Sequence, residues 1–421
     1  MARQMKDSGV EWIGEIPEDW NIRKLKSIIT CRDGERVPID SALRESGPYP
    51  YWGAGNITDY INNYLFDEEL VLLGEDGAPF FDKKRNVAFL VKGKVWVNNH
   101  IHVLKADKEV ISSYLVHFLN IVDFGCYING SILNKLTQSN MNRISVAFPS
   151  KYEQQKIANF LDEKVGEIDS VIAKTKETIE DYKKYKQTII TDAVTKGLNP
   201  DVEMKESKTS YLGLIPAHWN EKRLRFLGMC QNGISKSSEY FGEGYPFVSY
   251  GDVYKNYTLP EMGSGLIKSS EEDRNIYSVQ NGDVFFTRTS ETIEEVGFAS
   301  TCLKSIDNAT FAGFVIRFRP NNQEELLPEF SKYYFRSDAH RKFFVKEMNL
   351  VTRASLSQEL LKKLPVLLPP LEEQRKITEY LDEKCSEIDK LIAKKEELLA
   401  DLESYKKSLI YEYVTGKKEV E

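Results

Sequence analysis

The chain contains two copies of one sequence pattern, and this duplication constrains its architecture more than any other feature. The pattern Ile-Pro-x-x-Trp, from Ile16 to Trp20, returns 199 positions later from Ile215 to Trp219. A second series of matches begins at Leu136 and returns at an offset of 220 residues. So many matches in two fixed registers indicate a tandem duplication.

The middle of each copy has diverged, whereas its flanks have stayed alike. Residues 36–130 and 235–352 share almost no residue matches, yet both contain short apolar runs beside Gly and Asn turns. Such runs predict strands, so the expected fold class is α+β: a tandem duplication of a β-rich module followed by a long helix. The expected divisions are modules at 1–150 and 211–370, helices at 151–197 and 371–416, and a polar linker at 198–210.

The two predicted helices carry apolar residues at steps of three and four over nearly six heptads, which is typical of a coiled coil. Prolines precede them and Gly197 and Gly416 follow them, as helix boundaries require. Two helices with one apolar stripe each most easily bury the stripes against each other, so we expect an antiparallel pair; core helices of a larger bundle are the alternative. The residues expected at this seam are Ile157, Leu161, Ile168, Ile172, Ile179, Ile377, Leu381, Ile388, Ile392 and Leu399.

Composition excludes several classes of protein. The 57 basic and 64 acidic residues give a net charge of −7, so bulk charge does not attract a polyanion, although a local surface can still bind DNA. No run of about 18 apolar residues predicts a membrane span. The five cysteines are scattered without a CxxC pair, which favours a reduced, cytoplasmic protein without a cysteine-based metal site.

Motifs for catalysis are missing from the sequence. No phosphate-binding GxxxxGK[ST] loop occurs, and the glycines at 53 and 55 do not join a buried strand to a helix as a cofactor loop requires. His100 and His102 alternate as metal ligands on a strand would, but no third ligand lies nearby in sequence, so hydrogen bonding or a structural role is favoured and no metal is expected. The chain is therefore expected to bind rather than to catalyse.

The duplicated motifs resemble the specificity subunit of type I restriction–modification enzymes. The resemblance rests on the Ile-Pro-x-x-Trp entry and on a Pro-x-x-x-Glu-Gln-x-Lys-Ile helix start, which contains Glu153-Gln154 in one copy and Glu373-Gln374 in the other. It implies that each module reads one part of a bipartite, asymmetric sequence of double-stranded DNA. It also implies that the helices set the gap and that their seam region docks two modification subunits, which carry S-adenosylmethionine. Restriction subunits, which use ATP and Mg²⁺, would join this assembly, and the chain itself would bind no cofactor.

Base reading needs Arg, Lys, Asn or Gln in the major groove, while phosphate contacts also use Ser, Thr and backbone N–H groups. Polar, turn-prone stretches in both modules supply such groups, although each of these residues could instead be a solvated turn or a cap. A protein–protein scaffold of two modules on a rod is the competing interpretation. The candidate DNA contacts are Asn56, Asn98, Asn99, His100, His102, Ser131, Lys135, Ser249, Tyr250, Arg288, Thr289, Ser290, Arg353 and Ser355.

Overall fold

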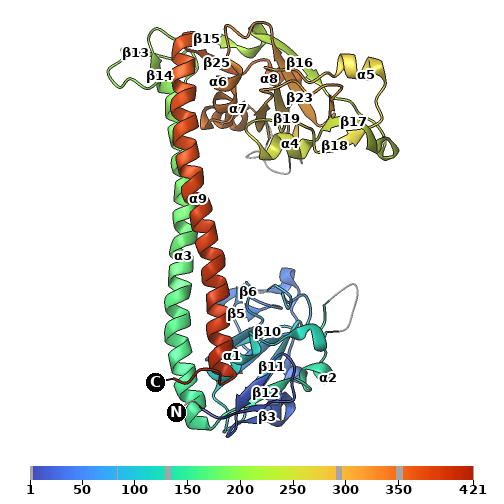
Figure 1. The fold of residues 1–421 in the computed structure, drawn as a ribbon, viewed down its shortest axis with the longest axis vertical. Coiled ribbons are helices and arrows are strands. Elements are labelled where there is room, and N and C mark those ends of the chain that lie inside the picture. The colour runs from blue at the N-terminus through green and yellow to red at the C-terminus, as the bar shows by residue number, and fades with distance from the viewer. Residues whose placement is uncertain (1–2, 83, 129–133, 291–295, 348–353, 421) are drawn as a thin grey trace. The chain divides into compact units, whose positions relative to one another are not determined.

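A computed structural model describes residues 3–82, 84–128, 134–290, 296–347 and 354–420 (Figure 1). The chain forms two compact units, of which one comprises residues 1–177 and 395–421 and the other residues 178–394. Each unit therefore holds one module together with part of both long helices. Among the described residues, no helix is long and apolar enough to cross a bilayer.

The two long helices are α3 (Lys151–Lys196) and α9 (Leu371–Val414). Each ends at a glycine with positive φ, 75° at Gly197 and 73° at Gly416. Each glycine lies against the tryptophan of one Ile-Pro-x-x-Trp motif. A Cβ added to Gly197 would be 3.3 Å from Trp219, and one added to Gly416 would be 3.1 Å from Trp20. Any side chain here would meet both strain and a crowded neighbour.

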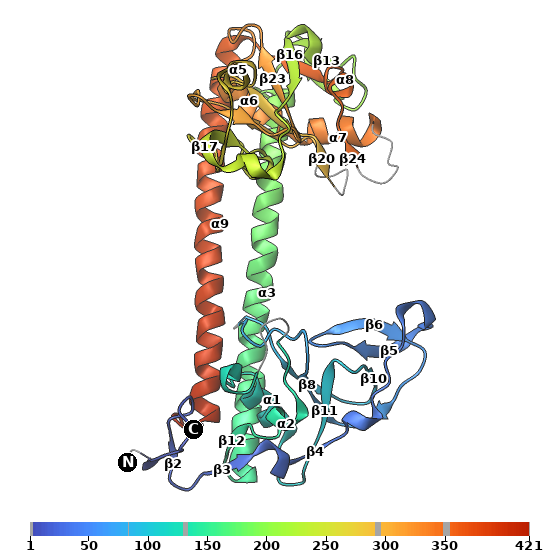
Figure 2. The same cartoon turned by 90° about the vertical axis from the view of Figure 1, so that its right-hand side faces the viewer.

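Within each unit, the segments of the two helices pair antiparallel, as predicted (Figures 1 and 2). In the first unit, Lys406 on α9 donates to Asp169 on α3 at 2.6 Å. In the second unit, Lys186 on α3 donates to Asp389 on α9 at 2.7 Å. Lys406 and Lys186 therefore form matching ion pairs across the two helices, one in each unit.

The predicted seam is inward-facing along its length, but its residues do not all face the other helix. Ile157 and Leu161 belong to the core of the first module, and Ile377 and Leu381 belong to that of the second. The start of each helix thus packs on its own module. Ile172, Ile179 and Ile388 are also buried, whereas Ile168, Ile392 and Leu399 are half-buried.

The first module contains two four-stranded sheets and small flanking elements. One sheet is antiparallel in the order β4-β11-β8-β9, and the other has the order β6-β5-β10-β7 with β5 and β10 parallel. Its elements are β1 (Met5–Asp7), β2 (Glu15–Pro17), β3 (Asn21–Lys24), β4 (Ile29–Cys31), β5 (Ser46–Trp52), β6 (Ile57–Ile61), β7 (Phe66–Asp67), β8 (Leu70–Gly74), β9 (Ala88–Val91), β10 (Lys94–Val97), β11 (Ile101–Ala106), α1 (Ser112–Leu119), α2 (Gln138–Met141) and β12 (Ser145–Phe148).

The second module repeats this plan. Its antiparallel sheet has the order β16-β23-β19-β21, and its second sheet has the order β18-β17-β22 with β17 and β22 parallel. Its elements are β13 (Met204–Glu206), β14 (Leu214–Pro216), β15 (Asn220–Arg223), β16 (Gly228–Asn232), β17 (Phe241–Val248), α4 (Tyr250–Lys255), β18 (Gly265–Ile267), α5 (Glu271–Ile276), β19 (Val284–Thr287), β20 (Thr289–Ser290), β21 (Ala299–Thr301), β22 (Thr310–Phe311), β23 (Val315–Pro320), α6 (Pro328–Tyr334), α7 (Asp338–Glu347), β24 (Ala354–Ser355), α8 (Gln358–Leu361) and β25 (Pro365–Leu368).

The expected linker at 198–210 contains a short strand. Residues 204–206 form β13, which pairs antiparallel with β14. The same pairing joins β1 to β2 at the start of the first module. Lys6 donates to the backbone carbonyl of Glu18, and Lys205 donates in the same way to that of Ala217. Three-residue strands are too short to show periodicity, so this part of the repeat was not visible as structure in the sequence.

The Glu-Gln motif of the frame joins each long helix to its module. Glu153 accepts the indole N–H of Trp20 at 2.8 Å, and Glu373 accepts that of Trp219 at 3.0 Å. The neighbouring glutamine is completely buried in both units. Each pair of motifs thus forms one joint, in which a tryptophan from the module entry meets a glutamate on the first turn of the helix.

Candidate nucleic-acid interface

A corner of the first module brings several predicted contact residues together at the turn between β10 and β11. The turn begins where the backbone N–H of Asn98 donates to Trp52 at 3.1 Å. It ends where the carbonyl of His100 accepts the N–H of Glu75 at 3.0 Å, just beyond β8. The carbonyl of Glu75 in turn accepts the N–H of Leu136 at 2.7 Å. Four segments that are distant in sequence therefore meet here, and we call this arrangement the recognition corner.

The second module has the same recognition corner at the turn between β22 and β23. The N–H of Ala312 donates to Val248 at 3.0 Å, and the N–H of Arg288, just beyond β19, donates to Phe314 at 2.9 Å. The carbonyl of Arg288 accepts the N–H of Leu356 at 2.7 Å. These bonds match those of the first module one for one, and Leu356 is the repeat partner of Leu136.

The side chains on the two matching backbones have unlike chemistry. Glu75 corresponds to Arg288, and His100 corresponds to Phe314. An isolated bridge between Asp76 and Lys135 corresponds to the pairing of Thr289 with Ser355 on β20 and β24. One corner therefore presents mixed charges, and the other presents an arginine, hydroxyl groups and an aromatic ring.

Charge pairing organises the surface of the first corner. The Nδ1 atom of His100 lies 2.5 Å from Oδ1 of Asp76, and half of the His100 side chain is exposed. Lys135 reaches Glu75 at 3.2 Å and Asp76 at 3.7 Å. The backbone of Ala54, in the turn that ends at the exposed Asn56, lies beside Gly74 at the end of β8. Asn99, at the tip of the β10–β11 turn, is exposed.

His102 and Asn98 are structural rather than contact residues, which corrects their assignment to the DNA-binding surface. His102 is 1% exposed; its Nδ1 atom lies 2.6 Å from Asp33 and its Nε2 atom 2.8 Å from the carbonyl of Leu136. Asn98 is also buried, and its side-chain oxygen accepts the N–H of His100. Both residues shape the turn from within, because buried polar groups need such partners.

The ligating atoms of Asp33, Glu75 and His102 lie within 4.8 Å of one another, as metal ligands would. Arg36, however, lies 2.5 Å from Glu75 and 3.5 Å from Asp33. Burial raises the pKa of the Asp33 carboxyl, but the hydrogen bond from His102, the N–H of Val103 and the charge of Arg36 outweigh it and hold this pKa below its usual value. The guanidinium thus supplies the positive charge that the carboxylates need, and the cluster is a structural ion-pair network.

A cluster of aromatic rings lies next to the second corner. Tyr250 stacks on Tyr254 with ring centroids 5.9 Å apart, and Tyr254 contacts Phe298 at 5.2 Å. The N–H of Phe298 donates to the Thr287 hydroxyl, next to Arg288. Ser249, which is half-buried, caps α4 by accepting the N–H of Asp252.

Of the remaining predicted residues, some lie at the second corner and others lie outside the described part of the chain. Arg288 and Thr289 are half-buried at the corner, and Ser355 is exposed beside Thr289. Ser131 and Arg353 lie outside the described residues, as does the side chain of Ser290.

Sequence reasoning missed Glu75, Asp76 and Phe314, which complete the two corners. Glu75 and Asp76 directly follow the buried run Leu70–Gly74, so their place at a strand end was a usable signal. Phe314 follows Gly313 at a turn, but an apolar residue there gave no indication of a binding role.

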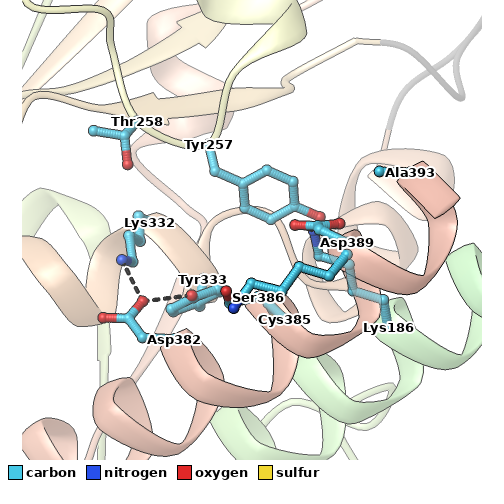
Figure 3. Close-up of a pocket in the computed structure, with 11 residues that line it drawn as sticks. Lys186, Tyr257, Thr258, Lys332, Tyr333, Asp382, Cys385, Ser386, Asp389 and Ala393 are labelled. Carbon is cyan, nitrogen blue, oxygen red and sulfur yellow. Dashed lines mark hydrogen bonds and ion pairs between the residues drawn. The ribbon is translucent and has the colours of Figure 1, made fainter.

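A cavity of about 550 Å³ lies where α9 meets the second module (Figure 3). Asp382 on α9 accepts hydrogen bonds from Lys332 and Tyr333 on α6, both at 2.6 Å. In the first unit, the repeat partner of Asp382 is Asp162, which lies 2.7 Å from Nε2 of His117 on α1. Burial raises the pKa of the Cys385 thiol in this cavity. The cavity lines a joint that holds helix to module, and the described residues around it form no catalytic constellation.

The two modules share the backbone arrangement of the corner but differ in its side chains, and a repeated helical frame joins them. This combination defines a modular recognition protein. The family model for the type I restriction modification DNA specificity domain matches twice, at residues 17–181 and 216–401. The chain therefore belongs to this family of type I DNA specificity subunits, which are not themselves catalytic.

Individual relatives agree with this assignment. A protein named as a putative type I restriction enzyme specificity subunit from Haemophilus influenzae is 26% identical over 91% of this chain and 89% of its own length. The EcoKI specificity subunit of Escherichia coli is 24% identical over 96% and 90%. A solved chain from work on the assembly and conformational transition of a type I restriction–modification system has a TM-score of 0.67 and 15% identity, over 96% of this chain and 99% of that one. This last likeness supports the fold.

Proposed function

We propose that the two recognition corners read the two halves of a bipartite, asymmetric sequence in double-stranded DNA. The observation that carries the proposal is the match of their backbone hydrogen bonds combined with the difference of their side chains. A repeated frame under divergent side chains is what two readers of different sequences require. The competing scaffold interpretation gives no reason for this divergence at one point of the fold.

The chemistry of each corner suggests what it reads. In the second module, Arg288 can donate two hydrogen bonds to O6 and N7 of guanine. In the first, Asn99 can pair with adenine, and the carboxylate of Asp76 can accept from the N4 amino group of cytosine. Lys135 suits a phosphate or a guanine. Because these groups differ, the two half-sites should differ, which makes the complete site asymmetric.

The helical frame supports binding of two copies of one partner. The joints Trp20–Glu153 and Trp219–Glu373, like the contacts of Asp162 and Asp382 with their modules, occur once in each unit. These internal joints repeat one arrangement of helix and module in both units, which suits two identical modification subunits, and the paired helices would set the gap between half-sites. In this assembly S-adenosylmethionine would bind to the modification subunits, ATP and Mg²⁺ would bind to restriction subunits, and this chain would hold no cofactor.

The net charge of −7 bears on how the assembly binds DNA. Phosphate neutralisation supplies much of the affinity in most protein–DNA complexes. An acidic specificity subunit therefore depends on its partners for this contribution. We expect the isolated chain to bind DNA weakly and the complete methyltransferase to bind it well.

The proposal is tested by co-expressing the chain with a type I modification subunit from the same genome and sequencing the host genome for N6-methyladenine. The expected result is one bipartite, asymmetric motif with a fixed gap. A control culture expresses the modification subunit alone and should show no such motif. Co-purification without any sequence-specific methylation would contradict the proposed function.

A further inference from the structure

Phe314 stands out among the residues of the second recognition corner because it is 65% exposed. Its neighbours in the turn are buried, with Ala312 at 8% and Val315 at 0%. The N–H of Val315 donates to the carbonyl of Ala312 at 3.0 Å and closes the turn. The ring thus projects from a tight turn whose flanking residues are anchored in the core.

The backbone around Phe314 is fixed from three sides. The N–H of Arg288 donates to the carbonyl of Phe314, and the N–H of Ile234 donates to that of Phe311 at 2.9 Å. Gly313 lies so close to Ser235 that a Cβ at this position would collide with the serine hydroxyl. The turn is therefore held in place before any ligand binds, which reduces the entropy lost on binding.

Exposed apolar side chains are common singly and need no function by themselves. Phe314 differs from the others by its place. It occupies the position of His100 in the first module, where the carbonyl of His100 accepts the N–H of Glu75 as that of Phe314 accepts the N–H of Arg288. The same backbone position thus presents an imidazole in one module and a phenyl ring in the other, beside the residues proposed to read bases.

We propose that Phe314 is a specificity-determining residue that packs against the 5-methyl group of a thymine in the major groove. The thymine methyl is the one apolar group that base edges present there, and apolar side chains recognise it. Arg288, just beyond the neighbouring strand β19, would contact an adjacent base or phosphate. This inference rests on the proposed function and adds that one half-site contains an A·T pair read by its methyl group.

The test uses the assembled methyltransferase and begins from the methylated motif of the wild-type complex. Synthetic duplexes then carry uracil in place of each thymine of the motif in turn, which deletes only the methyl group. Binding to each duplex is measured with the wild-type complex, with Phe314→Ala and with the matched control Phe226→Ala. Phe226 is 66% exposed in the same module but lies outside the corner.

The expected result is that one uracil weakens wild-type binding by roughly three- to fivefold, as loss of one buried methyl group predicts. Phe226→Ala should show the same loss, whereas Phe314→Ala should bind the thymine and uracil duplexes equally. Phe314→Leu, which keeps an apolar side chain, should retain part of the discrimination.

Two results would overturn the inference while leaving the proposed function intact: no uracil affects wild-type binding to an established bipartite motif, or Phe314→Ala discriminates as the wild type does. A wild-type complex that methylates no bipartite motif would instead overturn the proposed function, and this inference with it.

Discussion

Replacing Gln154 by alanine should destabilise the first unit far more than the same replacement of its neighbour Gln155 on α3. The Gln154 side chain is completely buried. Its oxygen accepts the N–H of Ile111 at 3.0 Å, and its nitrogen donates to the carbonyls of Glu109 at 3.2 Å and Pro149 at 3.1 Å. One side chain therefore satisfies three backbone groups, at the start of α1 and at the start of α3.

The magnitude follows from those three bonds. A buried backbone group that loses its partner costs about 1–3 kcal/mol. Because relaxation and water entry recover part of this, we expect the free energy of unfolding to fall by roughly 3–5 kcal/mol in total. Gln155 provides the control, since it is exposed and its side chain donates to Asn159 one turn along the same helix. Gln155→Ala should change stability by less than about 0.5 kcal/mol.

The assay must resolve the two units, because a protein of this kind need not unfold in a single transition. Hydrogen–deuterium exchange followed by peptide mass spectrometry gives protection separately for α1 and α6. Gln154→Ala should speed exchange in α1 and leave α6 unchanged, while Gln374→Ala should do the reverse, since Gln374 makes the matching bonds to Leu327 and Glu325. Equal protection in Gln154→Ala and Gln155→Ala would refute the reasoning.

Three further predictions concern charge, pH and DNA binding. Reversing Lys186 to Asp should cost about 0.3–1 kcal/mol of stability in denaturant titrations, because its partner Asp389 is largely exposed, and the double reversal with Asp389→Lys should restore most of it. Burial lowers the pKa of His340 to about 3, below its usual value of about 6.5. Between these two pH values the imidazole binds a proton in the unfolded chain but not in the folded one, so stability is lost as pH falls below 6.5. Between about pH 7.5 and 5.5 the second unit should lose about 1.4 kcal/mol in urea titrations, and His340→Gln should remove this contribution; an unchanged slope would contradict it. Arg288→Ala should weaken binding of the target duplex by the assembled methyltransferase by roughly 1–3 kcal/mol. If the variant binds both the target and the non-target duplex as tightly as the wild type does, Arg288 does not belong to the interface.

The sequence predicts the frame well because local signals determine it. Prolines before the helices, glycines after them and a steady apolar stripe place both long helices almost to the residue. The sequence does not predict β13, because this strand depends on pairing with β14 rather than on any pattern of its own.

The recognition corners could be predicted only in part, because they depend on hydrogen bonds between distant segments. Residue chemistry and turn context predict Asn99, Lys135 and Arg288 as contacts, and the structure places all three at the corners. The burial of His102 could not be predicted, because its partner Asp33 lies 69 positions away and alternation along a strand does not show which face of the sheet is covered. The equivalence of Glu75 and Arg288 rests on backbone atoms, and no residue match reveals it.

The core of the first unit has a consequence for the order in which the protein folds during synthesis. Leu409, Ile410 and Val414 pack with Trp20 and its neighbours, and the Tyr114 hydroxyl donates to the carbonyl of Val414. A ribosome that adds about 5–20 residues each second needs roughly 15–60 s to travel from residue 114 to residue 414. During that interval the first module lacks part of its core, while the second module emerges together with both of its helix segments. The module that is made first is therefore expected to be completed last, and a chaperone that shields apolar surface would act on it in the meantime.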